Sequence, residues 1–316
     1  MTDLDRAVRT VVRRCLNIRP DEDVVVVVDE PLQELGEKLR NAAQQSGAEA
    51  VLTVMSPRPT DGSEPPAPVA EALAACDVFI APASRSLSHT LARKRASEAG
   101  ARGATMPHVT TDMLARLMSI DFDRMKSRSR AVAELLDKGA EARIACPLGT
   151  DLTLDLKGRH GIVDDGDLTA PGAFGNLPCG EGFIAPANGT GTMFATSIAA
   201  IGLASGQPAK LTLENGHLTD ATGPEGEKLI GILREHGENG TNLAELGVGT
   251  NDRATLTGNV LEDEKILGTV HIAFGASIAM GGTVSVPIHL DCVVTEASLS
   301  IDGTQVLDEG RFVLAA

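Results

Sequence analysis

The chain has 316 residues, enough for two domains of ordinary size. Its 28 Lys and Arg against 43 Asp and Glu give a net charge of −15, and residues 139–316 carry most of that excess, with 9 basic and 23 acidic side chains. An acidic surface repels phosphate, and a chain without Trp or Tyr offers few rings for base stacking. We therefore expect no nucleic-acid partner.

The five cysteines are odd in number and widely spaced, and no C-x-x-C pair occurs. This pattern favours reduced thiols over a disulfide framework or a zinc ribbon, and it predicts a cytoplasmic protein. The N-terminus starts acidic and then becomes amphipathic, unlike a signal peptide. The longest uncharged run, residues 266–288, contains Pro287 and several glycines, which is typical of buried strands rather than of a membrane span.

The first half alternates apolar runs with amphipathic segments. The run Val24–Val28 is apolar at every position, as in a strand with both faces buried in a parallel sheet. Strands are expected at 24–28, 50–55, 77–81 and 104–106, and helices at 4–16, 32–43, 87–99 and 121–138. This order predicts an α/β, Rossmann-like scaffold domain over residues 1–138, built on an open, doubly wound sheet.

Domains of this kind often bind dinucleotides through a glycine-rich turn after the first strand. Here that turn reads Asp29-Glu30-Pro31, and neither G-x-G-x-x-G nor a P-loop motif occurs. Because carboxylates at this turn would repel a pyrophosphate, we expect no nucleotide cofactor and assign this domain a scaffolding role.

From Ile144 onward the pattern changes to short strands separated by Gly, Asp and Asn. Strands are expected at 150–156, 182–185, 210–213, 269–274 and 287–294, with one helix at 224–236. This half is predicted to be a β-rich α+β domain over residues 139–316 that carries the metal site and the catalytic residues.

The clearest candidates for chemistry are histidines in apolar strands. His289 and Asp291 are two residues apart, so on a strand they project from the same face, about 7 Å apart, and can converge on one ion. His271 lies in a second apolar strand, where a buried imidazole needs partners. The alternatives are a hydrogen-bonded His–Asp pair and a structural core histidine. Two histidines with one carboxylate also form a facial metal triad.

Two glutamates stand in glycine-rich or apolar surroundings, Glu181 in Leu-Pro-Cys-Gly-Glu-Gly-Phe and Glu245 in Leu-Ala-Glu-Leu-Gly. Each is a candidate ligand, and the alternative for each is an ordinary turn residue. The charged run Glu262–Lys265 is expected to be a solvated turn. Cys179 is disfavoured as a nucleophile because no residue near it in the sequence would activate it. The remaining five histidines are expected at the surface.

Ordered motifs through the second half resemble the thermophilic metallo-aminopeptidase family, also called the aminopeptidase T family. They are GTDLTLDLKGR (149–159), GNLPCGEGFIAP (175–186), AELGVGTN (244–251), LEDEKILGTVHIAFG (261–275) and VPIHLDCVV (286–294). The resemblance implies a homodimeric hydrolase that cleaves a small peptide or amide. It also implies a site for two divalent ions, zinc or cobalt, in which Glu181 and Glu245 are catalytic as well as ligands. The implied ligands are Glu181, Glu245, His271, His289 and Asp291.

One position departs from this pattern, because Ile278 stands where the family has a tyrosine. A missing hydrogen-bond donor of this kind can cost about 10²–10³ in rate. Two alternatives to the aminopeptidase therefore stay open. The motifs also resemble 2,5-dihydroxypyridine dioxygenases, which hold one Fe(II) on two histidines and an aspartate, and His271, His289 and Asp291 could serve in that role. The other alternative is a catalytically eroded relative.

Overall fold

The computed structural model describes residues 2–315. The chain divides into two compact units, one reaching to Ile120 and including Gly166–Cys179, the other comprising Asp121–Asp165 and the chain from Gly180 onward. The expected boundary near residue 138 differs from this division. The helix at Phe122–Lys138 belongs to the second unit because it packs on two of that unit's strands, and Gly166–Cys179 returns to the first unit to add a strand.

The first unit is a parallel five-stranded sheet in the order β2-β1-β3-β4-β8. The strands are β1 Asp23–Asp29, β2 Glu49–Met55, β3 Val78–Ala83, β4 Arg102–Pro107 and β8 Phe174–Asn176. The helices are α1 Asp3–Arg9 with its π-helical continuation Thr10–Cys15, α2 Gln33–Gln44 with a 3-10 turn at Glu30–Leu32, α3 Ala67–Ala75, α4 Leu91–Glu98 and α5 Thr111–Leu117.

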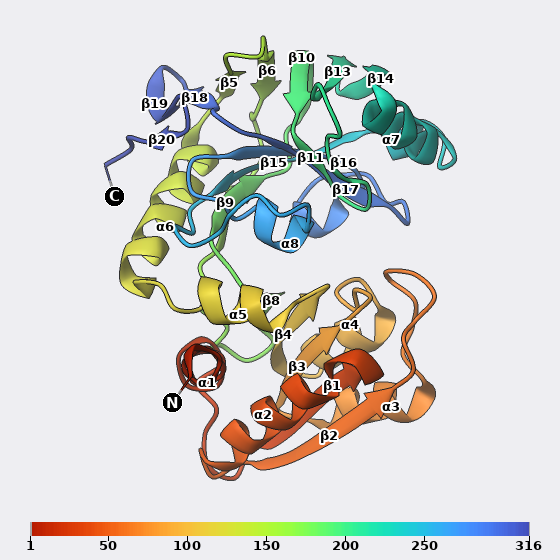
Figure 1. Ribbon diagram of the computed structural model, residues 1–316, viewed down its shortest axis with the longest axis vertical. Helices are drawn as coiled ribbons and strands as arrows, with labels where there is room; N and C mark the ends of the chain where they lie inside the picture. The colour runs from red at the N-terminus through yellow and green to blue at the C-terminus, as the bar shows by residue number, and fades with distance from the viewer. Residues whose placement is uncertain (1, 316) are drawn as a thin grey trace. The chain divides into compact units, whose positions relative to one another are not determined.

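Helices cover both faces of this sheet, as the apolar β1 run predicted. Val24–Val28 are all buried, with α2 packed on β1 and β2, and α3 packed on β1 and on α4. Figure 1 shows these helices on the two sides of the strands, in the red-to-orange part of the chain. The doubly wound fold expected for the first half is therefore confirmed.

The second unit contains two antiparallel sheets. The eight-stranded sheet has the order β14-β13-β10-β6-β5-β18-β19-β20, and the seven-stranded sheet has the order β12-β11-β17-β16-β15-β9-β7. The first consists of β5 Glu141–Ala145, β6 Asp151–Asp155, β10 Asn188–Ala195, β13 Ala209–Glu214, β14 His217–Thr222, β18 Ser298–Ile301, β19 Thr304–Asp308 and β20 Arg311–Phe312. The second consists of β7 Ile162–Asp164, β9 Glu181–Ile184, β11 Ser197–Ile198, β12 Gly202–Leu203, β15 Leu243–Gly249, β16 Val270–Gly275 and β17 His289–Val294.

One apolar core joins the two sheets. It contains Leu154 and Leu211 of the larger sheet together with Leu246, Ile272 and Cys292 of the smaller one. Because side chains alternate along a strand, the intervening residues of the smaller sheet point away from this core. The candidate site lies on that other face.

Helices complete the second unit. α6 Phe122–Lys138 packs on β9 and β7, and α7 Pro224–Arg234 packs on β13 and β14. Shorter elements are α8 Val260–Asp263 and the 3-10 turns Glu238–Thr241 and Ile278–Met280. No helix among residues 2–315 is long and apolar enough to cross a membrane.

Candidate metal centre

The sheet register brings the five predicted ligands to one face of the seven-stranded sheet. The ligand positions lie on four adjacent strands, β17, β16, β15 and β9, and each has a glycine or alanine as one of its cross-strand partners. The pairs are His289 with Gly275, Asp291 with Ala273, Glu245 with Ala273, His271 with Gly247, and Glu181 with Gly249. Residues directly paired across antiparallel strands point to the same side. Large donor groups therefore alternate with small residues that leave room for them.

The two histidines converge on one carboxylate. The Nε2 atom of His271 lies 3.3 Å from Oε1 of Glu245, and the Nε2 atom of His289 lies 3.3 Å from Oε2 of the same side chain. Asp291 adds an Oδ1 atom 3.5 Å from His289 Nε2, and Glu181 adds an Oε2 atom 3.4 Å from His271 Nε2. The donor atoms form two groups of three residues, and within each group they lie within 4.8 Å of one another. Glu245 belongs to both groups.

The arrangement of polar atoms suits a bound cation. His289 Nδ1 lies 2.8 Å from the carbonyl oxygen of Ala276, so this nitrogen donates its proton there. In the neutral ring the Nε2 lone pair then faces the carboxylates of Glu245 and Asp291, an arrangement typical of metal-binding histidines. Glu181 Oε2 is buried without a hydrogen bond. Imidazole nitrogens and carboxylate oxygens suit Fe(II), Zn²⁺ and related ions.

The ionisable groups of the site shift one another's pKa values. Burial by itself lowers the pKa of His271, but its hydrogen bond to Glu245 and the nearby carboxylates raise that pKa to about 9. The pKa of His289 likewise lies well above its usual value, because the charge of Asp291 outweighs burial. Burial raises the pKa of Glu245, yet hydrogen bonds from both histidines lower it overall. In the absence of metal, protons on the histidines would therefore balance the carboxylates.

Lys265 belongs to this site and was missed from the sequence. Its side chain is 1% exposed, and its Nζ atom lies 2.5 Å from Glu181 Oε1, 2.9 Å from Glu264 Oε1 and 3.5 Å from Asp164 Oδ2. Burial raises the pKa of Glu264 to about 8 and that of Asp164 to about 7, against the opposing charge of Lys265. The site thus contains five carboxyl groups and one ammonium group, an excess of acidic groups that favours the binding of cations.

The expectation that Glu262–Lys265 is a solvated turn was wrong. Glu262, Asp263 and Lys265 are 1% exposed or less because the loop folds onto their side chains. Asp263 accepts hydrogen bonds from Ser197 Oγ and from the backbone N–H groups of Thr257 and Gly258. Four consecutive charges between apolar pairs, Val260-Leu261 and Ile266-Leu267, were the available signal.

The other residues singled out from the sequence are not among these donor groups. Ile278, in the expected tyrosine position, is 57% exposed in a 3-10 turn, and Cys179 is buried in the first unit. The five histidines expected at the surface are half-buried or exposed. They are His89, His108, His160, His217 and His236.

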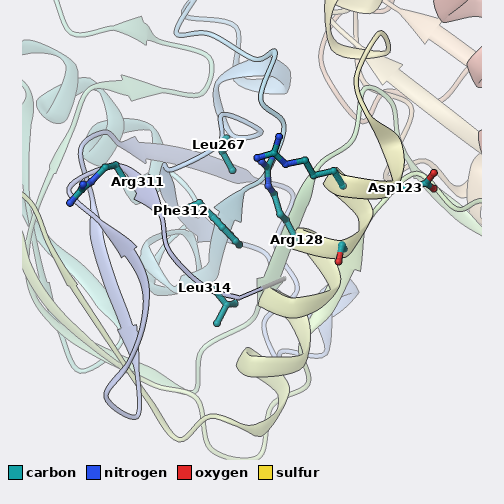
Figure 2. Close-up of a pocket in the computed structure, with 9 residues that line it drawn as sticks. Asp123, Arg128, Leu267, Arg311, Phe312 and Leu314 are labelled. Atoms are coloured by element: carbon teal, nitrogen blue, oxygen red, sulfur yellow. The ribbon is translucent and has the colours of Figure 1, made fainter.

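The second unit also has a pocket whose lining residues differ from those of the histidine cluster (Figure 2). It is lined by Asp123, Arg124, Ser127, Arg128, Leu267, Gly310, Arg311, Phe312 and Leu314. Arg128 extends from α6 toward the Phe312 ring, 6.0 Å from its centroid, and its Nη1 atom lies 3.5 Å from Asp252 Oδ2. Guanidinium groups cannot ligate a metal, so this pocket does not compete with the histidine cluster.

Comparison with known proteins identifies the family to which this fold and this donor cluster belong. A family model described as NicX, 2,5-dihydroxypyridine 5,6-dioxygenase, matches residues 3–314. The chain belongs to this family of ring-cleaving dioxygenases. No curated protein matches the chain.

Two solved structures share the fold. The 2,5-dihydroxypyridine dioxygenase from Pseudomonas putida KT2440 has a TM-score of 0.84 and 19% sequence identity, and the match covers 100% of this chain and 99% of that one. AmpT from Thermus thermophilus has a TM-score of 0.74 and 19% identity, with 99% of each chain covered. At these identities the likeness shows the fold.

The prediction of a metallo-aminopeptidase, and with it the assignment as a hydrolase and protease, was wrong. The family model covers almost the whole chain and describes a dioxygenase, which was the stated alternative. The resemblance to the aminopeptidase T family is limited to the fold, as the match to AmpT shows. The physical reason is that the same donor types, two histidines with carboxylates, serve both chemistries, so the ligand motifs do not separate them.

Proposed function

We propose that this protein is a non-haem Fe(II) dioxygenase that opens a dihydroxylated pyridine ring. The observation that carries the proposal is the convergence of His271 and His289 on Glu245, with Asp291 beside them, in a chain whose family model describes such a dioxygenase. Two histidines and one carboxylate are the ligand set that suits Fe(II) oxygenases, because three protein ligands leave positions open.

His271, His289 and Asp291 would hold the ion. Ala276 orients His289 through its carbonyl group, and the strand pairing of β16 with β17 holds all three side chains on rigid elements. Bound Fe(II) would supply the redox chemistry that a reaction with dioxygen requires.

Glu181 would accept a proton, whereas Glu245, whose pKa is lowered by both histidines, would stay ionised beside the two rings. A hydroxylated ring has to release a proton when it binds beside a cation, and a nearby carboxylate is a suitable acceptor. Both glutamates are 6% exposed, so bulk water has little access to them. Lys265 pairs with the far oxygen of Glu181 and leaves Oε2 directed at His271.

The test uses the purified protein reconstituted anaerobically with Fe(II). We expect 2,5-dihydroxypyridine to disappear only after dioxygen is admitted, with one dioxygen consumed per ring, as followed by ultraviolet absorption and an oxygen electrode. His236→Ala, on a half-buried residue that belongs to neither donor group, is the matched control and should keep this activity. A loaded protein that consumes neither ring nor oxygen would overturn the proposal.

A further inference from the structure

Lys265 is a fully buried lysine whose ammonium group contacts three acidic side chains. Its Nζ atom contacts Glu181 at 2.5 Å, Glu264 at 2.9 Å and Asp164 at 3.5 Å. Lysine is almost never fully buried unless it is paired. The ammonium group therefore occupies a position in which oxygen atoms from three elements surround one positive charge.

The strand pairing explains why a cation is needed there. Asp164 of β7 and Glu181 of β9 are directly paired across the sheet. Like charges directly opposite each other on antiparallel strands repel, and burial strengthens the repulsion. Glu264, which follows α8, adds a third carboxylate. Without a positive charge among them, these three acidic groups would repel one another whenever more than one of them is ionised.

The backbone holds Lys265 over the sheet. A Cβ atom at Gly249 would lie 2.1 Å from the carbonyl oxygen of Ile266 and 2.7 Å from the carbonyl carbon of Lys265, so only glycine permits this close approach. The N–H group of Asn251 donates to the carbonyl oxygen of Lys265 at 2.9 Å, and that of Leu267 donates to Asn251 at 3.0 Å. These contacts fix the backbone from which the Lys265 side chain extends toward the three acidic groups.

We propose that Lys265 is a positioning residue, whose ammonium group acts as a built-in cation between Asp164, Glu181 and Glu264. It holds Glu181 by Oε1 and so keeps Oε2 facing His271, 3.4 Å from its Nε2 atom. The role given to Glu181 rests on the proposed function, whereas the cation position rests on the three ion pairs alone. Removing the lysine should leave a vacancy that an external cation fills.

The test compares Lys265→Ala with the wild type, with Mn²⁺ as the probe. Equilibrium dialysis followed by metal analysis should show one more Mn²⁺ per chain in Lys265→Ala than in the wild type. The matched control is the double variant Lys265→Ala with Glu264→Gln, which removes one carboxylate with the lysine and should lack the extra ion. Methylammonium, which mimics the lost ammonium group, should displace the extra Mn²⁺. It should also raise the kcat of Lys265→Ala at least tenfold.

Equal Mn²⁺ counts in Lys265→Ala and the wild type would overturn the inference, as would a loss of kcat that methylammonium does not restore. Lys265→Ser, which leaves the position of the ammonium group open, is measured in the same way in case the alanine variant unfolds. If neither variant folds even in Mn²⁺ or methylammonium, no external cation replaces the lysine and the inference fails. Counting the bound Mn²⁺ requires no catalytic activity, so this test of the cation position remains valid whether or not the protein proves to be a dioxygenase.

Discussion

Gly247 and His271 are paired directly across β15 and β16, and the imidazole lies over the glycine. A Cβ atom at position 247 would be 1.9 Å from His271 Nε2 and 2.2 Å from its Cε1. Real Cβ contacts are never so short, so any side chain at this position has to displace the imidazole. The glycine is therefore part of the site even though it offers no donor atom.

Gly247→Ala should weaken metal binding at least tenfold while the protein stays folded, because the displaced atom is the ligating nitrogen itself. Isothermal titration with Fe(II) or Zn²⁺ measures the affinity. Gly231→Ala is the matched control, since this helical glycine in α7 is exposed and a Cβ there meets nothing within 4 Å. The control should bind metal normally and gain up to about 1 kcal/mol of stability from helix propensity. Normal metal affinity in Gly247→Ala would show that His271 Nε2 is not a ligand.

His289→Ala and Asp291→Ala should each lose the metal and the activity. Both side chains lie on the face of the sheet opposite the core, so their removal leaves the packing of Leu290 and Cys292 intact. We expect circular dichroism spectra like that of the wild type and metal contents near zero after dialysis. His236→Ala should retain its metal. Full metal content in either site variant would contradict the ligand assignment.

The secondary structure around the site could be predicted well from the sequence. The apolar runs that form β16 and β17 indicated strands, and the alternation of side chains along a strand indicated which face would carry His271, His289 and Asp291. The order of the strands could not be predicted. Glu181 reaches His271 only because β9 pairs with the far edge of β15, which no local pattern indicates. Lys265 was missed for a related reason, since the burial of a charged loop depends on carboxylates supplied by β7 and β9.

The chemistry was less predictable than the donors. The five ligand candidates were identified from their apolar or glycine-rich surroundings, and the structure brings all five together. What separates oxygen chemistry from hydrolysis is the set of ions bound and the residues that contact the substrate. Neither can be predicted from the spacing of the histidines and carboxylates. The resemblance of motifs therefore indicated the wrong enzyme class among proteins that share this fold.

Metal affinity should rise steeply with pH between about 7 and 9. A metal can bind only after the histidines lose their protons, and the carboxylates raise the pKa of His271 to about 9 and hold that of His289 well above its usual value. The measurement is the apparent Kd of Zn²⁺ at a series of pH values in a non-coordinating buffer. An affinity independent of pH over this range would show that the histidines carry no protons in the free protein.

The same pKa shift predicts the stability of the metal-free protein. The pKa of His271 is higher in the folded state, at about 9, than its ordinary value of 6.5, so the folded state binds more protons between these values. Its contribution to stability is fully present below pH 6.5 and is lost as pH rises through 9. Thermal unfolding after chelation should therefore show Tm falling over this interval. Added metal should reverse the fall, since a ligand that binds only the folded state stabilises it.

Glu181→Gln distinguishes a ligand from a proton acceptor. Glutamine keeps the size of the side chain, and its carbonyl oxygen can still accept from Lys265, but it cannot take up a proton. If His271, His289 and Asp291 hold a single ion, this variant should bind as much iron as the wild type, while kcat for ring opening falls by about 10²–10⁴, the usual contribution of acid–base catalysis. Iron is measured by metal analysis and turnover by oxygen consumption, with Glu238→Gln as a control because this glutamate lies on an exposed turn of the second unit. If Glu181→Gln instead loses iron along with activity, then Glu181 ligates the ion with Glu245 and His271, and the proton has to be accepted by another group.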